Sequence, residues 1–334
     1  ELMKALQLTE IDQGPQYNEI SMPERRTGHA LVKLTASALN RRDVWIRRGQ
    51  YPGIRYPIVL GSDGCGVVCE TDTSQKHWQD KRVIIYPGYD WGDDERVQSS
   101  HYRILGLPDQ GTFAEYISVP VSHLRDAPRH LTDAQAAACP LAALTAWRAL
   151  KERGRMQTGD RVLVTGIGGG VAQFAAQFVH ALGGQLAMTS SSTEKLGGFD
   201  STLGAVCYLD DDWRAQLHAS CPTGFDIIID GAGGEGFGQL VRLLAPGGRL
   251  VFYGGTRGRW PAILPQHLFY KQAEILGSTM GSPRDFDQML TCINETQLKP
   301  LIGRSSPLRD GADAFDYLES GEQFGKVVLV NSNE

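Results

Sequence analysis

Hydrophobic and polar residues alternate over short runs in the amino-terminal third of the chain. Runs at 30–36, 64–70, 82–86 and 113–119 show this two-residue period, which predicts β-strands with one face against a core. No helical run separates them, so an antiparallel, barrel-like β region is expected up to about residue 120.

The pattern changes in the middle of the chain. An alanine-rich run at 132–150, opened by Thr132 as a cap, predicts a helix. Strand and helix patterns then alternate, which is typical of a doubly wound parallel sheet with helices on both faces. The six predicted strands are 161–165, 185–189, 205–209, 225–230, 249–253 and 274–278.

The tail ends in a β-rich run at 326–330 with no helical pattern behind it. We expect this run to rejoin the first β region, which makes the first domain discontinuous. The predicted division is 1–125 for its amino-terminal part, 126–280 for the α/β domain and 281–334 for the return.

Composition and charge argue against several functions. Thirty-three basic and 38 acidic residues leave a net charge of −5, without the basic excess of a nucleic-acid-binding protein or a membrane anchor. Apolar stretches are too short to span a bilayer and no secretion signal is recognised. The six cysteines include no C-x-x-C pair, which is typical of free thiols. We expect a cytoplasmic protein.

Glycine is in excess, with 39 of 334 residues, and its clusters follow predicted strands. The run 161–170 reads RVLVTGIGGG and precedes a helical pattern. Backbone N–H groups and the positive end of the helix dipole favour a phosphate there. Close packing without a ligand is the alternative, but further glycines follow later strands. We therefore predict that a dinucleotide binds at Gly168, Gly169, Gly170, Val171, Gly231, Gly254 and Gly255.

The end of the second α/β strand favours NADPH over NADH. NAD-dependent enzymes carry an acidic residue there for the ribose 2′-hydroxyl, whereas this chain has Ser190, Ser191 and Ser192, followed by Lys195. Ser190, Ser191 and Lys195 are therefore candidate 2′-phosphate ligands. The serines could instead cap a helix, and both roles can coexist.

The chain as a whole resembles the medium-chain dehydrogenase/reductase superfamily, in particular its quinone-oxidoreductase-like and zinc-type alcohol-dehydrogenase-like members. The resemblance implies a GroES-like catalytic domain, a Rossmann domain, NAD(P)H between them and a homodimer. It is carried by ALNRRD at 38–43, GSDGCG at 61–66, GTFAEY at 111–116, PLAALTAW at 140–147, the glycine turn at 166–172, the segment 247–255 and GEQFGKVV at 321–328.

The resemblance also shows where this chain departs from the zinc enzymes. Their catalytic metal ligands match Asn40, Ser62 and a position near Leu141, none of which is a usual zinc ligand. Their structural-zinc cysteines are missing from 89–104. Their proton-relay hydroxyl matches Arg42, which cannot deprotonate near neutral pH. We expect an enzyme without zinc.

Further cofactor contacts are implied by the same resemblance. Arg41 matches a pyrophosphate-binding position, although it could be a surface arginine without a ligand. Asp210, Asp211 and Asp212 replace an Asn-Tyr pair that helps to bind the adenosine phosphate in relatives, which weakens the case for NADPH. Positions that touch the nicotinamide half match Thr145, Gly254, Gly255, Thr256, Gly325 and Lys326.

Hydride transfer without a metal needs an electrophilic acceptor, and quinones and α,β-unsaturated carbonyls meet this condition. The resemblance places 40–51 at the substrate mouth. Asn40 and Tyr51 are the candidate hydrogen-bond donors, and Trp45 is a candidate wall for a flat acceptor. Tyr51 could alternatively pack the turn at Pro52. An alcohol dehydrogenase or aldehyde reductase, and a catalytically silent NADPH-binding sensor or structural protein, remain the alternatives.

Overall fold

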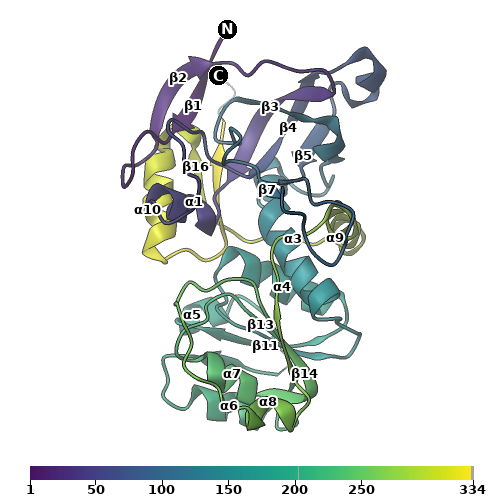
Figure 1. Cartoon of the computed structure of the whole chain (residues 1–334), viewed down its shortest axis with the longest axis vertical. Helices are drawn as coiled ribbons and strands as arrows, with labels where there is room; N and C mark the ends of the chain where they lie inside the picture. The colour runs from purple at the N-terminus through teal and green to yellow at the C-terminus, as the bar shows by residue number, and fades with distance from the viewer. Residues whose placement is uncertain (202, 332–334) are drawn as a thin grey trace. The chain divides into compact units, whose positions relative to one another are not determined.

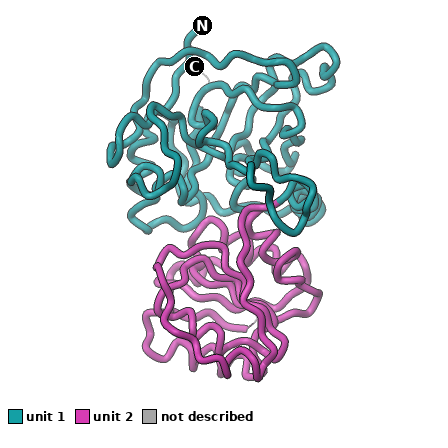
Figure 2. The backbone as a smooth tube through the Cα atoms, viewed as in Figure 1, with its two compact units in different colours: residues 1–142, 282–334 teal, residues 143–281 magenta. Residues whose placement is uncertain are grey.

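The computed structural model describes residues 1–201 and 203–331. The chain forms two compact units (Figure 2). Unit 1 consists of Glu1–Ala142 and Ser282–Glu334, and unit 2 consists of Ala143–Gly281. No helix in the described part of the chain is long and apolar enough to cross a membrane.

Unit 1 is built on a seven-stranded sheet (Figure 1). Its central strand β3 pairs antiparallel with β4, β8 and β17. The strands are β3 (His29–Ala38), β4 (Asp63–Glu70), β5 (Arg82–Ile85), β8 (Tyr116–Pro120), β9 (Leu124–Asp126), β16 (Ile302–Pro307) and β17 (Lys326–Val330). Two-stranded sheets are formed by β1 (Leu2–Gln7) with β2 (Gln16–Ser21), and by β6 (Gly88–Tyr89) with β7 (Arg103–Ile104).

Strand β17 brings the end of the chain back to unit 1. Its residues Val328, Leu329 and Val330 pair with the last residues of β3, and its other edge pairs with β16. All but the last of its five residues are buried. The helices of unit 1 are α1 (Arg41–Arg47), α2 (Asp133–Ala137), α9 (Pro283–Thr296) and α10 (Gly311–Ser320).

The single helix predicted at 132–150 is divided in the structure. Thr132 caps α2 by accepting from the backbone N–H of Gln135 at 3.2 Å. A second helix, α3 (Pro140–Arg148), begins at a proline, which lacks the N–H needed to continue the first. A π-helical turn, Ala149–Arg153, follows it. Helix α2 packs against β3 and β4, so unit 1 extends to Ala142 rather than ending near residue 125.

Unit 2 contains a six-stranded parallel sheet in the order β12-β11-β10-β13-β14-β15. This is the doubly wound order of a dinucleotide-binding domain. All six predicted strands are present, and β14 begins five residues before its predicted start. The strands are β10 (Arg161–Val164), β11 (Gln185–Ser190), β12 (Ala205–Cys207), β13 (Phe225–Asp230), β14 (Leu244–Phe252) and β15 (Glu274–Gly277).

Helices cover this sheet because its central strands are apolar on both faces. Leu163, Ile228 and Leu250 form a core with Leu217 and Phe237 from the helices. Helix α4 packs on β10 and β11 and contributes the buried rings of its two phenylalanines. The helices are α4 (Gly170–Ala181), α5 (Thr193–Leu196), α6 (Trp213–Ser220), α7 (Phe237–Arg242) and α8 (Gln266–Phe269).

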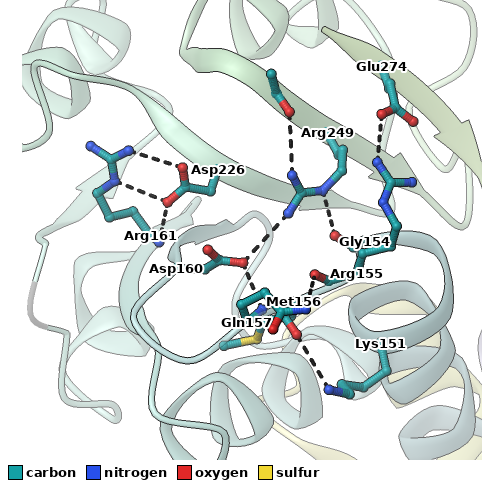
Figure 3. Close-up of polar contacts among 11 residues, drawn as sticks. Lys151, Gly154, Arg155, Met156, Gln157, Asp160, Arg161, Asp226, Arg249 and Glu274 are labelled. Atoms are coloured by element: carbon teal, nitrogen blue, oxygen red, sulfur yellow. Dashed lines mark hydrogen bonds and ion pairs between the residues drawn. The ribbon is translucent and has the colours of Figure 1, made fainter.

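Arginine–carboxylate contacts fix the amino-terminal ends of the strands in unit 2 (Figure 3). Asp226 at the start of β13 accepts from the backbone N–H of Arg161 at 2.8 Å and from its guanidinium at 3.1 and 3.0 Å. Arg249 in β14 donates to the carbonyl of Gly154 at 2.6 Å. The Asp226 contacts join the amino-terminal ends of β10 and β13, whose other ends carry glycine turns.

Asp226→Ala should lower the free energy of unfolding by about 1.5–3 kcal/mol, because it removes several hydrogen bonds to a charged partner. Glu274→Ala is the matched control, since its pair with Arg155 is about half exposed and such pairs contribute less than about 1 kcal/mol. Urea unfolding of both variants gives the comparison. Equal losses would contradict the assigned role of Asp226.

Candidate active site

The glycine turn of unit 2 has the geometry expected of a phosphate-binding loop. Gly166 and Gly168 have φ values of +68° and +114°, which side chains other than glycine rarely tolerate. Gly169 is the N-cap of α4. A Cβ on Gly168 would lie 2.9 Å from Cδ of Lys195. Lys195 therefore lies against the turn, and its charge adds to that of the helix N-terminus.

The three serines have different surroundings. Ser190 is 1% exposed and donates its hydroxyl to the carbonyl of Ile167 at 3.1 Å, so it ties the second strand to the glycine turn. Ser192 caps α5 by accepting from the backbone N–H of Lys195 at 3.5 Å. Ser191 is exposed. Ser191 is thus the one exposed serine of the three, and Lys195 lies against the glycine turn.

The glycines after β13 and β14 lie together. Asp230 accepts from the hydroxyl of Thr165 at 2.6 Å and from the backbone N–H of Gly233 at 2.9 Å, and burial raises the pKa of its carboxyl. A Cβ on Gly231 would lie 2.5 Å from the ring of Tyr253. A hollow of about 310 Å³ at the ends of β14 and β15 is lined by Phe252, Tyr253, Gly254, Gly255, Trp260, Gly277 and Ser278.

Two residues near these turns were missed by the sequence reasoning. Tyr208 directly follows β12, and the guanidinium of Arg257 lies 4.8 Å from its ring centre. The backbone N–H of Arg257 donates to Ala232 at 2.8 Å, which fixes the loop after β14. In the sequence, Arg257 was visible only as an arginine after Thr256. Its contacts with the loops after β12 and β13 depend on the strand order of the sheet, which the sequence pattern does not give.

Asp212 precedes α6, and its carboxylate accepts a hydrogen bond from the Gln216 side chain at 2.7 Å.

The remaining predicted cofactor residues lie in both units. Arg41 is exposed at the start of α1. Thr145 is 6% exposed, and its hydroxyl lies 3.9 Å from the sulfur of Met280. A Cβ on Gly325 would lie 2.6 Å from the carbonyl oxygen of Leu301, so backbone packing by itself requires this glycine.

A buried polar network joins the two ends of the chain within unit 1. The Lys326 ammonium donates to the carbonyl of Leu39 at 2.8 Å and to Asn40 Oδ1 at 2.6 Å, and lies 3.5 Å from Asp63 Oδ2. Asn40 Nδ2 donates to the same Asp63 oxygen at 2.9 Å. The other Asp63 oxygen accepts from the backbone N–H of Leu141 at 2.8 Å. The Lys326 ammonium thus has three acceptors within unit 1, which gives it a structural role, while its predicted cofactor contact stays a prediction.

A second buried group lies beside this network. Arg42 Nη1 donates to the Ser62 hydroxyl and to the carbonyl of Leu105, both at 3.1 Å. The ring centre of Tyr51 lies 5.0 Å from the Arg42 guanidinium carbon. Tyr51 and Trp45 are half-buried. The structure thus brings Asn40, Arg42 and Tyr51 into one region of unit 1.

The zinc enzymes that this chain resembles hold a catalytic zinc ion, and the side chains present at the matching positions here do not fit one. Asn40 and Ser62 are hydrogen-bonded to cationic side chains, which would repel a metal ion. Burial raises the pKa of Cys65 to about 12 and also that of Cys139, which opposes the thiolate form that zinc needs. Among residues 1–201 and 203–331, no group of three or more His, Cys, Asp or Glu side chains is placed to hold a metal ion.

Lys326→Met should lower the free energy of unfolding by about 3–5 kcal/mol, because it leaves the buried carboxylate of Asp63 without its cation. Adding Asp63→Asn should recover part of the loss, since the amide removes that charge. Urea unfolding of the single and double variants measures both effects. A loss below about 1 kcal/mol in Lys326→Met would contradict the structural role.

Two known domain families match this chain. Residues 26–129 match the alcohol dehydrogenase GroES-like domain family, and residues 170–295 match the zinc-binding dehydrogenase family. A solved structure described as an NAD-dependent alcohol dehydrogenase superposes with a TM-score of 0.92 at 32% identity, covering 99% of this chain and all of the other.

Two curated relatives cover most of the chain. The zinc-type alcohol dehydrogenase-like protein YogA of Leptosphaeria maculans is 36% identical over 94% of both chains. The 2-methylene-furan-3-one reductase of Solanum lycopersicum is 29% identical over 93% of this chain and 74% of its own length. Together with the GroES-like and Rossmann units, these matches show that the chain is an oxidoreductase of the medium-chain dehydrogenase/reductase superfamily.

Proposed function

We propose that the protein is an NADPH-dependent reductase of α,β-unsaturated carbonyls and quinones that works without zinc. One observation carries this proposal: cationic side chains are bonded to the two residues that match zinc-ligand positions. Lys326 donates to Asn40, and Arg42 donates to Ser62. Without a metal to polarise it, the acceptor must itself stabilise the incoming charge. The tomato relative is named for a methylene-substituted ketone, a conjugated acceptor of this kind.

The residues present fit a dinucleotide. Gly168, Gly169 and the start of α4 would hold the pyrophosphate, and the hollow after β14 and β15 would take part of the cofactor. Ser191, Lys195 and Arg257 would bind the 2′-phosphate, which is the basis for proposing NADPH rather than NADH. The chemistry that this cofactor supplies when bound is transfer of a hydride from its nicotinamide ring.

Residues of unit 1 would prepare the acceptor. The Tyr51 phenol is the proposed donor to the carbonyl oxygen and Trp45 the wall for a planar acceptor. Asn40 holds Asp63 and Lys326 in place, so we assign it a positioning role. In the overall reaction the acceptor takes up a hydride at carbon and one proton, and the cofactor is released oxidised.

Gly168→Ala should weaken NADPH binding at least about tenfold, since its Cβ would displace Lys195 and block the phosphate. Gly247→Ala is the matched control for backbone strain: its φ is +75° and no atom lies within 4 Å of the added Cβ. Isothermal titration with NADPH and NADH measures both affinities. Equal loss in the two variants, or tighter NADH than NADPH binding by the wild type, would contradict the proposed cofactor site.

Tyr51→Phe should reduce kcat/KM for the best enone or quinone by about 10²-fold, the usual range for loss of one acid–base or hydrogen-bonding group. The KM for NADPH should stay the same. An acceptor panel that contains 2-cyclohexen-1-one, menadione and ethanol with NADP⁺ tests the reaction class, before and after dialysis against a chelator.

Two results of this panel would overturn the assignment as a zinc-free reductase, and a third result would exclude the role of Tyr51. Ethanol oxidation that is lost on chelation would support a zinc alcohol dehydrogenase. NADPH binding without turnover of any acceptor would support a sensor or structural protein. Full activity of Tyr51→Phe would exclude its role as donor.

A further inference from the structure

The Arg42 guanidinium is a buried cation that makes no direct ion pair among the described residues and uses only one of its three nitrogens for hydrogen bonds. Its side chain is 8% exposed, and arginine stays protonated at any physiological pH. Its hydrogen bonds go to two neutral oxygens, those of Ser62 and Leu105. Within the described residues it forms no ion pair, Nε is buried without a partner, and no hydrogen bond is made by Nη2.

Another arginine of the same helix provides an internal comparison. Arg47 is 2% exposed, and it is paired with Asp316 at 2.7 Å and also with Glu319. The fold thus pairs Arg47 directly with two carboxylates, whereas Arg42 has only a longer-range interaction with Asp43. The Nε atom is buried without a partner in both arginines. Burial alone does not account for the difference between Arg42 and Arg47.

Two buried carboxyl groups lie near Arg42 without bonding to it, and Asp43 Oδ1 has no hydrogen-bond partner of its own. Asp43 lies within electrostatic range of Arg42, but its bonded oxygen accepts from the backbone N–H of Asn40 at 2.8 Å. Asp63 is bonded to Asn40, Leu141 and Lys326. Neither carboxylate forms a hydrogen bond with the Arg42 guanidinium. A buried N–H group without an acceptor is costly, and an anionic ligand would supply the acceptor that Arg42 Nε lacks.

We propose that Arg42 is a catalytic residue that binds the acceptor's anionic oxygen through Nε and Nη2. This inference rests on the proposed function and names a further residue of that site. Tyr51 lies over the guanidinium, so both would reach the same oxygen. The buried surroundings strengthen such an interaction.

The proposed step balances for an enone. Hydride adds to the β-carbon, the alkene electron pair forms the new bond between the α- and carbonyl carbons, and the carbonyl π-pair moves to oxygen. Arg42 stabilises the resulting enolate oxygen by donating two hydrogen bonds and keeps its own proton. The α-carbon then takes a proton from water or from Tyr51, which solvent reprotonates.

The same guanidinium chemistry would also bind a carboxylate that the acceptor carries permanently. Two substrates distinguish these sources: neutral 2-cyclohexen-1-one and the carboxylated enone 3-acetylacrylate. A loss with both substrates assigns Arg42 to the developing enolate. A loss confined to 3-acetylacrylate assigns it to the fixed carboxylate, and in both cases the anion-binding role is supported.

The decisive variants are Arg42→Ala and Arg42→Lys, with Arg48→Ala as the control. Arg48 lies directly after α1, is more exposed and is paired with Glu319 and Asp12. We expect Arg42→Ala to lower kcat/KM by about 10²–10³-fold, as for loss of an oxyanion donor, with an unchanged KM for NADPH. Arg42→Lys should retain more activity, and guanidinium at millimolar concentration should partly restore Arg42→Ala.

A purely structural role would predict different results. Arg42→Ala that folds normally and keeps kcat/KM within about twofold for both enones would overturn the proposal. An equal loss of activity in Arg48→Ala and Arg42→Ala would also overturn the proposal. A loss in Arg42→Ala that added guanidinium does not relieve, and that is as large in Arg42→Lys, would overturn it as well. Thermal unfolding of each variant shows whether it is folded, and Arg42→Lys keeps the test valid if Arg42→Ala is not.

Anion binding can be measured without turnover, which separates this proposal from the proposed function. Acetate should raise the melting temperature of the wild type more than chloride at equal ionic strength, and this difference should vanish in Arg42→Ala. Equal stabilisation of both proteins by acetate would overturn the role of Arg42. If the wild type reduces no acceptor, the proposed function fails, while the acetate result still decides whether Arg42 binds an anion.

Discussion

The buried contact between Lys326 and the Asn40–Asp63 pair holds unit 1 together at its site. Lys326 is the first residue of β17, Asn40 precedes α1, and Asp63 is the first residue of β4. One ammonium group thus joins the end of the chain to two segments near its beginning. The low dielectric of the interior makes this contact strong when it is complete and costly when one partner is missing.

Helix α1 depends on this network for its position. It starts directly after Asn40, so fixing that residue fixes where Arg42, Trp45 and the following Tyr51 lie. Arg47 fastens the other end of the helix through Asp316 and Glu319 of α10. The helix is short, and these side-chain contacts at both ends supply the rigidity that a candidate site requires.

Unit 2 relies on backbone geometry for its candidate phosphate-binding turns. Parallel strands end at one edge of the sheet, so the turns after β10, β13 and β14 come close although they are far apart in sequence. Asp230 links two of them by accepting from Thr165 and Gly233. Small residues at these turns leave room for a phosphate and a ring, while Lys195 and Arg257 supply the positive charge.

The sequence alone determined the elements and the family, because strand periodicity, glycine after strands and the dispersed motifs are local or additive signals. The family resemblance also led to the prediction that Asn40 and Ser62 stand at zinc-ligand positions, since residue identity can be compared position by position. Only the tertiary structure separated Ser190, which is buried in a backbone contact, from exposed Ser191. It also showed that Lys326 is fully bonded while Arg42 Nε is buried without a hydrogen-bond partner. These distinctions depend on partners distant in sequence, which the fold alone brings together.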